Sequence, residues 1–390
     1  MNDKETGSFY TPHKLVKYMV EKVMDDEFTP EMILEPSAGD GRFVKELQEY
    51  GGKVFAIEIN KNKVRKMKDM VNENTNIYCR DFIRYSLVTN EKFDLVIGNP
   101  PYINKKNLSE KDKIKSQKLV DYWNLQGSIF QNLWVSFVLG SLKLLSPEKG
   151  RIFFVLPFEF LQSKYAEKLR AFLEQKFNTI EIITYEEKIF SDIDQDVCLV
   201  LLKNIPTNQP SIKYITLNNT DEFKEISNNE IRRDKPLIKW SNAILANDEL
   251  ILIERITSGF VSISDIGFVF PGIVTGSNKF FIINNNKKEE MNCSEYVLPI
   301  IEKSNYIQNM ILYNKNDFNN LIIRNKPVWL LNLQGVEENE LSPKMVEYLS
   351  EGEDRELVKR YKCSIRKRWF EVPNIKKGDK IGRASCRERV

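Results

Sequence analysis

The first 205 residues alternate short apolar runs with longer amphipathic segments, and this alternation constrains the fold more than any other feature. The apolar runs predict strands at Met32–Glu35, Lys53–Ile59, Asn76–Cys79, Phe93–Gly98, Arg151–Leu156, Thr179–Tyr185 and Val197–Leu202. Between them, Lys61–Val71 and Ile129–Leu145 have the three- and four-residue spacing of helices that bury one face. Strand–helix–strand units of this kind form parallel sheets with helices on both faces. We therefore predict an α/β, Rossmann-like, doubly wound domain over residues 1–230.

The amino-acid composition of the chain changes after residue 203. The stretch 204–229 is polar, with two prolines and clustered asparagines, and we expect it to lead out of the first domain. Shorter apolar runs separated by Gly, Pro and Asn follow it. They predict a second, mixed α+β domain with much strand over residues 240–380.

Several classes of protein are excluded by composition. The chain has no apolar leader and no run near the roughly 20 apolar residues that span a bilayer, so we expect a cytoplasmic protein without a membrane partner. Its five cysteines form no C-x-x-C pair, which argues against a disulfide framework or a zinc ribbon, and no metal site is expected. His13 is the single histidine, which disfavours hydrolases with a Ser-His-Asp or Cys-His arrangement.

Charge is distributed unevenly along the chain. The formal net charge is +3, but the segment from Arg355 to the end carries 13 basic and 4 acidic residues. A mildly acidic body with a basic end is typical of proteins that bind nucleic acid. The last ten residues, IGRASCRERV, resemble the in-frame translation of a sequencing adapter. We expect residues 381–390 to be non-native and the second domain to be truncated.

A glycine-containing loop follows the first predicted strand. It reads Glu35-Pro36-Ser37-Ala38-Gly39-Asp40-Gly41, and its glycines allow a ligand to approach the backbone closely. The dinucleotide fingerprint G-x-G-x-x-G would need glycine at position 44, where Val44 stands, and no Walker motif is present. The loop is therefore predicted to bind a nucleotide-like cofactor other than NAD or ATP.

Acidic residues follow the next two strands in the same position. Glu58 ends the second strand, where a carboxylate can bind ribose hydroxyls. Asp81 and Phe82 follow the third strand and could bind an adenine by a hydrogen bond and a flat ring. Each residue alone is a weak signal, because a strand-end acid is more often a solvated charge. Together they favour S-adenosylmethionine as the cofactor.

The motif Asn99-Pro100-Pro101-Tyr102 follows the fourth strand. The two prolines fix the backbone and remove two N–H donors, which leaves a rigid ledge of acceptors. The Asn99 side-chain oxygen and the Pro100 carbonyl can accept both hydrogens of an exocyclic amine, while Tyr102 offers a stacking face. Asn-Pro-Pro is also a turn sequence, but the preceding strand and glycine loop favour a catalytic role.

These motifs, in this order, resemble the gamma-type N6-adenine DNA methyltransferases of restriction–modification systems, the TaqI-like group. The resemblance implies a class I methyltransferase fold and transfer of a methyl group to a flipped adenine in double-stranded DNA. It implies that Tyr10, Thr11 and Pro12 close over the cofactor. It also implies that Phe190 covers the second face of the adenine, although from the residues alone Phe190 reads as part of the core.

The second domain resembles the target-recognition region of the same family. Its signatures are Pro271–Gly276 and Ile365–Phe370, where basic residues beside aromatic ones suit phosphate contact and base stacking. Any single basic residue in these signatures could equally belong to a solvated charged face that binds nothing. No nuclease signature stands out, so any cognate endonuclease is expected to be a separate chain.

Two alternatives stay open on the sequence. Asn-Pro-Pro-Tyr also occurs in enzymes that methylate a glutamine amide of release factors, and related sites act on RNA bases. Those enzymes usually lack both the segment before the first strand and a large basic C-terminal domain. The other alternative is an inactive, truncated DNA-specificity module.

Overall fold

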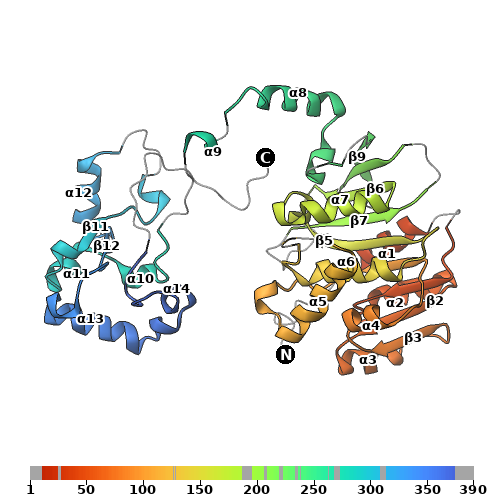
Figure 1. The fold of residues 1–390 in the computed structure, drawn as a ribbon, viewed down its shortest axis with the longest axis horizontal. Helices are drawn as coiled ribbons and strands as arrows, with labels where there is room; N and C mark the ends of the chain where they lie inside the picture. Colours follow the sequence, from red (N-terminus) through yellow and green to blue (C-terminus); the bar gives the residue numbers. More distant parts are fainter. Residues whose placement is uncertain are drawn as a thin grey trace. The chain divides into compact units, whose positions relative to one another are not determined.

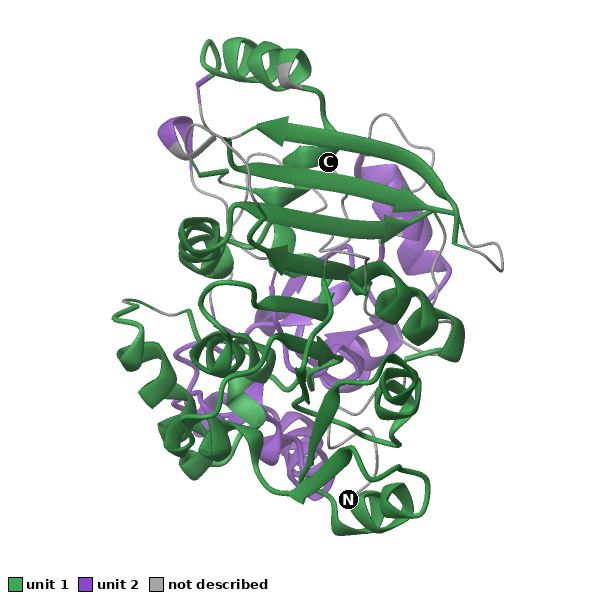
Figure 2. Ribbon diagram, turned by 90° about the vertical axis from the view of Figure 1, so that its right-hand side faces the viewer, with its two compact units in different colours: residues 1–260 green, residues 261–390 purple. Residues whose placement is uncertain are grey.

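A computed structural model describes residues 11–24, 28–125, 127, 129–186, 196–205, 209–218, 223–232, 236–237, 239–261, 263–267, 273–307 and 313–373. The chain forms two compact units, Met1–Phe260 and Val261–Val390, which are described separately (Figure 2). The first unit extends past the expected end at residue 230 because Trp240 packs into its core. The Trp240 ring meets Phe160 edge-on at 5.1 Å, and its indole N–H donates to Glu174 over 2.7 Å.

The first unit is built on a nine-stranded sheet with the order β3-β2-β1-β4-β5-β7-β6-β8-β9 (Figure 1). Its strands are β1 (Met32–Glu35), β2 (Lys53–Glu58), β3 (Thr75–Cys79), β4 (Leu95–Gly98), β5 (Arg151–Pro157), β6 (Thr179–Tyr185), β7 (Val197–Lys203), β8 (Ser211–Leu217) and β9 (Glu225–Arg232). The strands β3, β2, β1, β4 and β5 are mutually parallel, β7 is antiparallel to both its neighbours, and β9 is antiparallel to β8. The predicted α/β class is confirmed.

Helices cover both faces of this sheet. They are α1 (His13–Val23), α2 (Arg42–Leu47), α3 (Lys61–Lys68), α4 (Phe82–Val88), α5 (Glu110–Tyr122), α6 (Leu133–Leu144) and α7 (Glu167–Lys176), with α8 (Asn247–Thr257) after the last strand. Neighbouring residues of β5 show the two layers, because Phe153 packs with α1 and α2 while Phe154 packs with α4 and α6. The sheet is therefore doubly wound, and its parallel strands present their carboxyl ends at one edge.

The polar stretch 204–229 does not lead out of the first unit, as the sequence suggested, but contributes two strands to the sheet. In β8, Ile212 and Tyr214 are buried in the core. Asn228 and Asn229 fall in β9, the edge strand, whose side chains are mostly exposed. An edge strand needs little apolar content and is kept polar to avoid pairing with other chains.

The second unit has its own small core around an antiparallel sheet of order β10-β12-β11. Its strands are β10 (Ile282–Ile283), β11 (Val297–Pro299) and β12 (Trp329–Leu331), and its helices are α9 (Ile263–Ile266), α10 (Asn278–Phe281), α11 (Asn285–Glu290), α12 (Lys315–Ile323), α13 (Pro343–Asp354) and α14 (Tyr361–Ser364). The mixed α+β class is confirmed. The expected abundance of strand is wrong for the described residues, where helices predominate.

Residues 374–390, which include the expected non-native decapeptide, lie outside the described residues. Among the helices that the structure describes, none is long and apolar enough to cross a membrane. Within the same residues, no group of three or more His, Cys, Asp and Glu side chains could hold a metal ion.

Candidate functional site

Four adjacent parallel strands bring the predicted site residues to one edge of the sheet. In the order β3-β2-β1-β4, the strands end just before or at Asp81, Glu58, Glu35 and Asn99. Ligands of open α/β sheets bind outside the carboxyl ends of the strands, so this edge is the expected place for a site. The candidate residues lie far apart in the sequence and are gathered by the parallel topology alone.

The loop after β1 turns sharply on two glycines. Gly39 and Gly41 have φ values of 58° and 84°. This is a left-handed backbone conformation that residues with a Cβ adopt only at a cost in free energy. A Cβ on Gly41 would also lie 2.9 Å from Cγ of Met67 in α3. Pro36 is buried at the start of the turn. The sequence therefore needs glycine at position 41 for both its conformation and its packing.

Glu35 is a buried carboxyl group with unsatisfied hydrogen-bonding capacity. It is 2% exposed, and its Oε2 atom has no hydrogen-bond partner among the described residues. Burial raises the pKa of Glu35 well above its usual range, and the negative charges of Asp40 and Glu58 raise it further. A cationic ligand group would relieve this unfavourable environment.

Glu58 is held rigidly at the end of β2. Its carboxylate accepts hydrogen bonds from the Gly39 N–H over 2.9 Å and from the Asn60 N–H over 2.7 Å. These contacts fix the glycine loop against β2 and still leave lone pairs on both oxygens. The sequence reasoning missed the next residue, Ile59, which is 70% exposed at the same edge. The apolar pattern puts Ile59 in the strand, whereas β2 ends at Glu58 and leaves this side chain open to a flat ligand.

Asp81 and Phe82 take different positions in the structure. Asp81 caps α4 by accepting the Arg84 N–H over 3.1 Å, and it also pairs with the Lys115 ammonium of α5. Phe82 is 3% exposed, and its ring packs on Phe137 of α6 with centroids 4.9 Å apart. Asp81 therefore lies at the site edge, while the Phe82 ring is largely enclosed in the core.

The Asn99–Tyr102 motif is tied to the glycine loop and to the segment before α1. The Ser37 hydroxyl donates to the Asn99 carbonyl over 3.0 Å, and the Asn99 side-chain Nδ2 donates to Thr11 Oγ1 over 3.2 Å. Arg42, which the sequence reasoning also missed, donates to the Thr11 carbonyl over 2.8 Å. Pro12 stands just before the first residue of α1 and positions this segment.

The rest of the motif forms a rigid, half-buried ledge. Pro100 is buried and Pro101 is half-buried. The Tyr102 hydroxyl donates to the Val155 carbonyl of β5 over 2.9 Å, and burial raises the pKa of this phenol well above its usual range. The hydroxyl therefore stays protonated and anchors the ring, whose face remains the part suited to stacking.

Tyr10 and Phe190, the two other predicted site residues, lie outside the described residues, and so do Pro271 and Gly272 of the first C-terminal signature. The structure therefore brings together Thr11, the glycine loop, Glu58 and Asn99–Tyr102. It places Asp81 at the same edge of the sheet.

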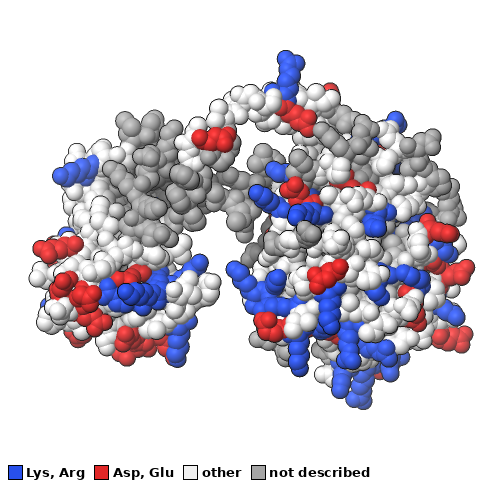
Figure 3. Space-filling view, in the orientation of Figure 1, with Lys and Arg blue, Asp and Glu red and all other residues white. Residues whose placement is uncertain are grey.

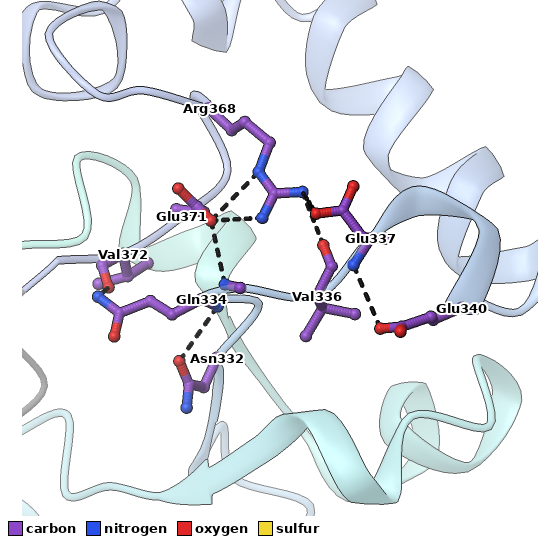
Figure 4. Close-up of polar contacts among 9 residues, drawn as sticks. Asn332, Gln334, Val336, Glu337, Glu340, Arg368, Glu371 and Val372 are labelled. Carbon is purple, nitrogen blue, oxygen red and sulfur yellow. Dashed lines mark hydrogen bonds and ion pairs between the residues drawn. The ribbon is translucent and has the colours of Figure 1, made fainter.

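The basic signature Ile365–Phe370 turns out to hold the second unit together. Arg366 donates to the carbonyls of Thr275 and Trp369 over 2.7 and 3.0 Å and so joins the two C-terminal signatures. Arg368 donates to Glu371 and to the Val336 carbonyl, as Figure 4 shows. Both guanidinium groups have internal partners, so the expectation that these arginines are available to phosphate is not supported. Of the three basic residues in the signature, only Lys367 has an exposed side chain.

Two family models match parts of this chain. Residues 37–190 match the family described as Eco57I restriction-modification methylase, and residues 237–386 match the C-terminal domain of type II methyltransferase M.Eco57I. The type II methyltransferase M.AccI of Acinetobacter calcoaceticus is 28% identical over 96% of this chain and 70% of its own length. M.HincII of Haemophilus influenzae is 30% identical over 58% of this chain, but only 42% of that relative is covered.

Solved structures share the fold at low sequence identity. The type IIL restriction-modification enzyme MmeI, solved in complex with DNA, aligns with 94% of this chain and 55% of its own length at a TM-score of 0.55 and 12% identity. A DrdV–DNA complex aligns with 83% of this chain and 42% of its own at a TM-score of 0.51 and 14% identity. The chain thus spans about half the length of these enzymes.

Proposed function

The chain belongs to the Eco57I family of type II restriction-modification DNA methyltransferases, and on that premise we propose that it methylates N6 of adenine in duplex DNA. The methyl donor in this proposal is S-adenosylmethionine. The observation that carries it is the direct connection between the Asn99–Tyr102 motif and the glycine loop, through the Ser37–Asn99 hydrogen bond. That connection puts an acceptor ledge for an amine beside a loop suited to a cofactor.

The chemistry of the donor set fits S-adenosylmethionine. Glu35 offers a buried carboxyl oxygen, unpartnered among the described residues, that suits the ammonium group of the methionine part. Glu58 retains acceptor capacity for ribose hydroxyls, and Ile59 offers an apolar surface for the adenine ring. When bound, the cofactor supplies an activated methyl group. We also propose that Tyr10, Thr11 and Pro12 close over it, as in the gamma-type enzymes.

On the DNA side, the target adenine leaves the base stack at a cost of about a few kcal/mol. The Asn99 side-chain oxygen and the Pro100 carbonyl accept the two hydrogens of N6 and so direct its lone pair away from the ring. Tyr102 holds one face of the base, and we propose that Phe190 holds the other. Positioning then supplies most of the rate enhancement, because no covalent nucleophile is needed. The released proton passes to water.

A tritiated-methyl transfer assay tests this proposal. The full chain is incubated with labelled S-adenosylmethionine and either duplex DNA, an RNA or a release factor. We expect label in DNA, recovered as N6-methyladenine, and none in the other acceptors. Asn99→Ala should abolish the transfer while retaining cofactor binding. Label recovered in protein or RNA, or undiminished transfer by Asn99→Ala, would overturn the assignment.

A further inference from the structure

The turn and helix that follow the Asn99–Tyr102 motif carry an excess of positive charge. Residues 105–118 contain six lysines and only two acidic residues, Glu110 and Asp112. Both acids are already engaged, since Glu110 pairs with Lys113 over 2.7 Å and Asp112 pairs with Lys115 over 2.7 Å. Figure 3 shows Lys and Arg gathered over the lower part of the first unit, where α3 and α5 lie.

Three of these lysines are exposed and have no compensating charge within the described part of the chain. Lys106, Lys111 and Lys118 are exposed, and none forms an ion pair with any residue that the structure describes. An ammonium group on a rigid helix without an internal partner contributes little to folding, so its charge is available to an external anion.

Lys111 and Lys118 belong to a stripe along one face of α5, and Lys106 lies in the turn before this helix. Lys111, Ile114, Lys118 and Tyr122 follow at spacings of three and four residues, which places them on one side of a helix. Ile114 and Tyr122 are each 57% exposed. The opposite side of α5 is buried through Leu119 and Val120. The stripe therefore alternates positive and apolar side chains on a helix that the core holds in place.

The stripe borders the proposed active site. The turn before α5 is fixed to the start of α6, because the Lys105 N–H donates to the Gln131 carbonyl and the Leu133 N–H to the Ile103 carbonyl, both over 2.9 Å. Lys115 of α5 pairs with Asp81, which lies at the carboxyl edge of the sheet. The surface thus begins four residues after Tyr102 and is joined through Lys115 to Asp81, a residue at the site edge.

We propose that this α5 surface, made of Lys106, Lys111, Ile114, Lys118 and Tyr122, contacts the sugar-phosphate backbone of duplex DNA beside the target base. Ammonium groups bind phosphates and release counterions, and apolar side chains pack on deoxyribose. The inference rests on the proposed function and deepens it. It assigns part of the electrostatic attraction for DNA to the first unit, because Arg366 and Arg368 already bind groups within the second unit.

The test compares two variants of the full chain that remove the same charge. The first is Lys106→Gln/Lys111→Gln/Lys118→Gln. The control is Arg65→Gln/Lys66→Gln/Lys68→Gln, in the last turn of α3, which leads away from the carboxyl end of β2. Affinity for a short labelled DNA duplex is measured over a series of salt concentrations. Circular dichroism and titration with S-adenosylmethionine verify that both variants fold and bind the cofactor.

We expect the dependence of log K on log salt to become shallower by about 0.9 for each phosphate that is no longer neutralised, hence by about 2–3 in the α5 variant. Its dissociation constant at low salt should rise by about tenfold or more, whereas the control should stay close to the wild type. An unchanged salt slope in the α5 variant overturns the inference, and so does an equal loss in both variants. If the wild type still methylates DNA in that case, only the α5 surface is refuted. A wild type that neither binds nor methylates DNA refutes the proposed function as well.

Discussion

Thr11→Val tests how the proposed catalytic amide is positioned. The substitution replaces a hydroxyl by a methyl group of the same shape at a site that is 4% exposed. In the structure, Asn99 Nδ2 donates to Thr11 Oγ1 over 3.2 Å. The Thr11 carbonyl keeps its hydrogen bond from Arg42, so the backbone stays anchored. The variant therefore changes one hydrogen bond to the Asn99 side chain and little else.

The magnitude follows from the value of one neutral hydrogen bond, which contributes about 0.5–1.5 kcal/mol net. If this bond holds the Asn99 amide in its productive orientation, its loss raises the barrier by that amount. Since about 1.36 kcal/mol corresponds to a factor of ten, methyl transfer should slow by roughly two- to tenfold. Cofactor affinity should change little, because the hydroxyl contacts Asn99 while the Thr11 backbone, which Arg42 holds in place, is retained.

Single-turnover methyl transfer at saturating S-adenosylmethionine measures the rate, and a separate titration measures cofactor affinity. Thr11→Ser is the matched control, because it keeps the hydroxyl and should retain nearly the wild-type rate. A wild-type rate in Thr11→Val would refute the positioning role. A rate in Thr11→Ser as slow as that of Thr11→Val would assign the effect to packing. A loss confined to cofactor affinity would show that the Thr11 hydroxyl serves the cofactor and does not orient the Asn99 amide.

Three further changes probe other parts of the structure. Gly41→Ala forces a Cβ to within 2.9 Å of Met67 Cγ at a φ of 84°, and the free energy of unfolding should fall by about 1–2 kcal/mol in a denaturant titration; an unchanged midpoint would contradict the loop geometry. Tyr102→Phe loses the hydrogen bond to Val155 but keeps the ring, so the melting temperature should fall while methyl transfer persists; abolished transfer would give the hydroxyl a role in the reaction. The hydrogen bond from Arg368 lowers the pKa of Glu371 below its ordinary 4.5, so the stability that this pair contributes is present above pH 4.5 and is lost as pH falls through the folded-state pKa. The melting temperature of the wild type should exceed that of Glu371→Gln at neutral pH, and this difference should shrink in acid. A difference in melting temperature that grows in acid would contradict the predicted pH dependence.

Much of the first unit could be predicted because its strands are locally encoded. Buried parallel strands need apolar residues throughout, and the motifs that follow β1, β2, β3 and β4 mark where each strand ends. The position of β7 between β5 and β6 could not be predicted, because pairing partners are not encoded in the pattern of a single strand. The edge strand β9 was missed for a related reason, since its polar residues, such as Asn228 and Asn229, resemble a linker.

The site was predictable in its residue types but not in its contacts. The sequence indicated that Asn99 and the glycine loop act together, yet the Ser37–Asn99 and Asn99–Thr11 hydrogen bonds depend on the tertiary fold. The basic signature misled for the same reason. An arginine that binds phosphate and one that binds carbonyl groups, as Arg366 does, look alike in a sequence.

The proposed reaction is methyl transfer to N6 of adenine at a defined DNA sequence. It can be tested by sequencing that detects modified bases in the DNA of a host expressing the chain. We expect N6-methyladenine at one recurring sequence, and its absence when Asn99→Ala is expressed. Unmodified adenine with the wild-type chain present, or modification of cytosine in its place, would refute the proposed reaction.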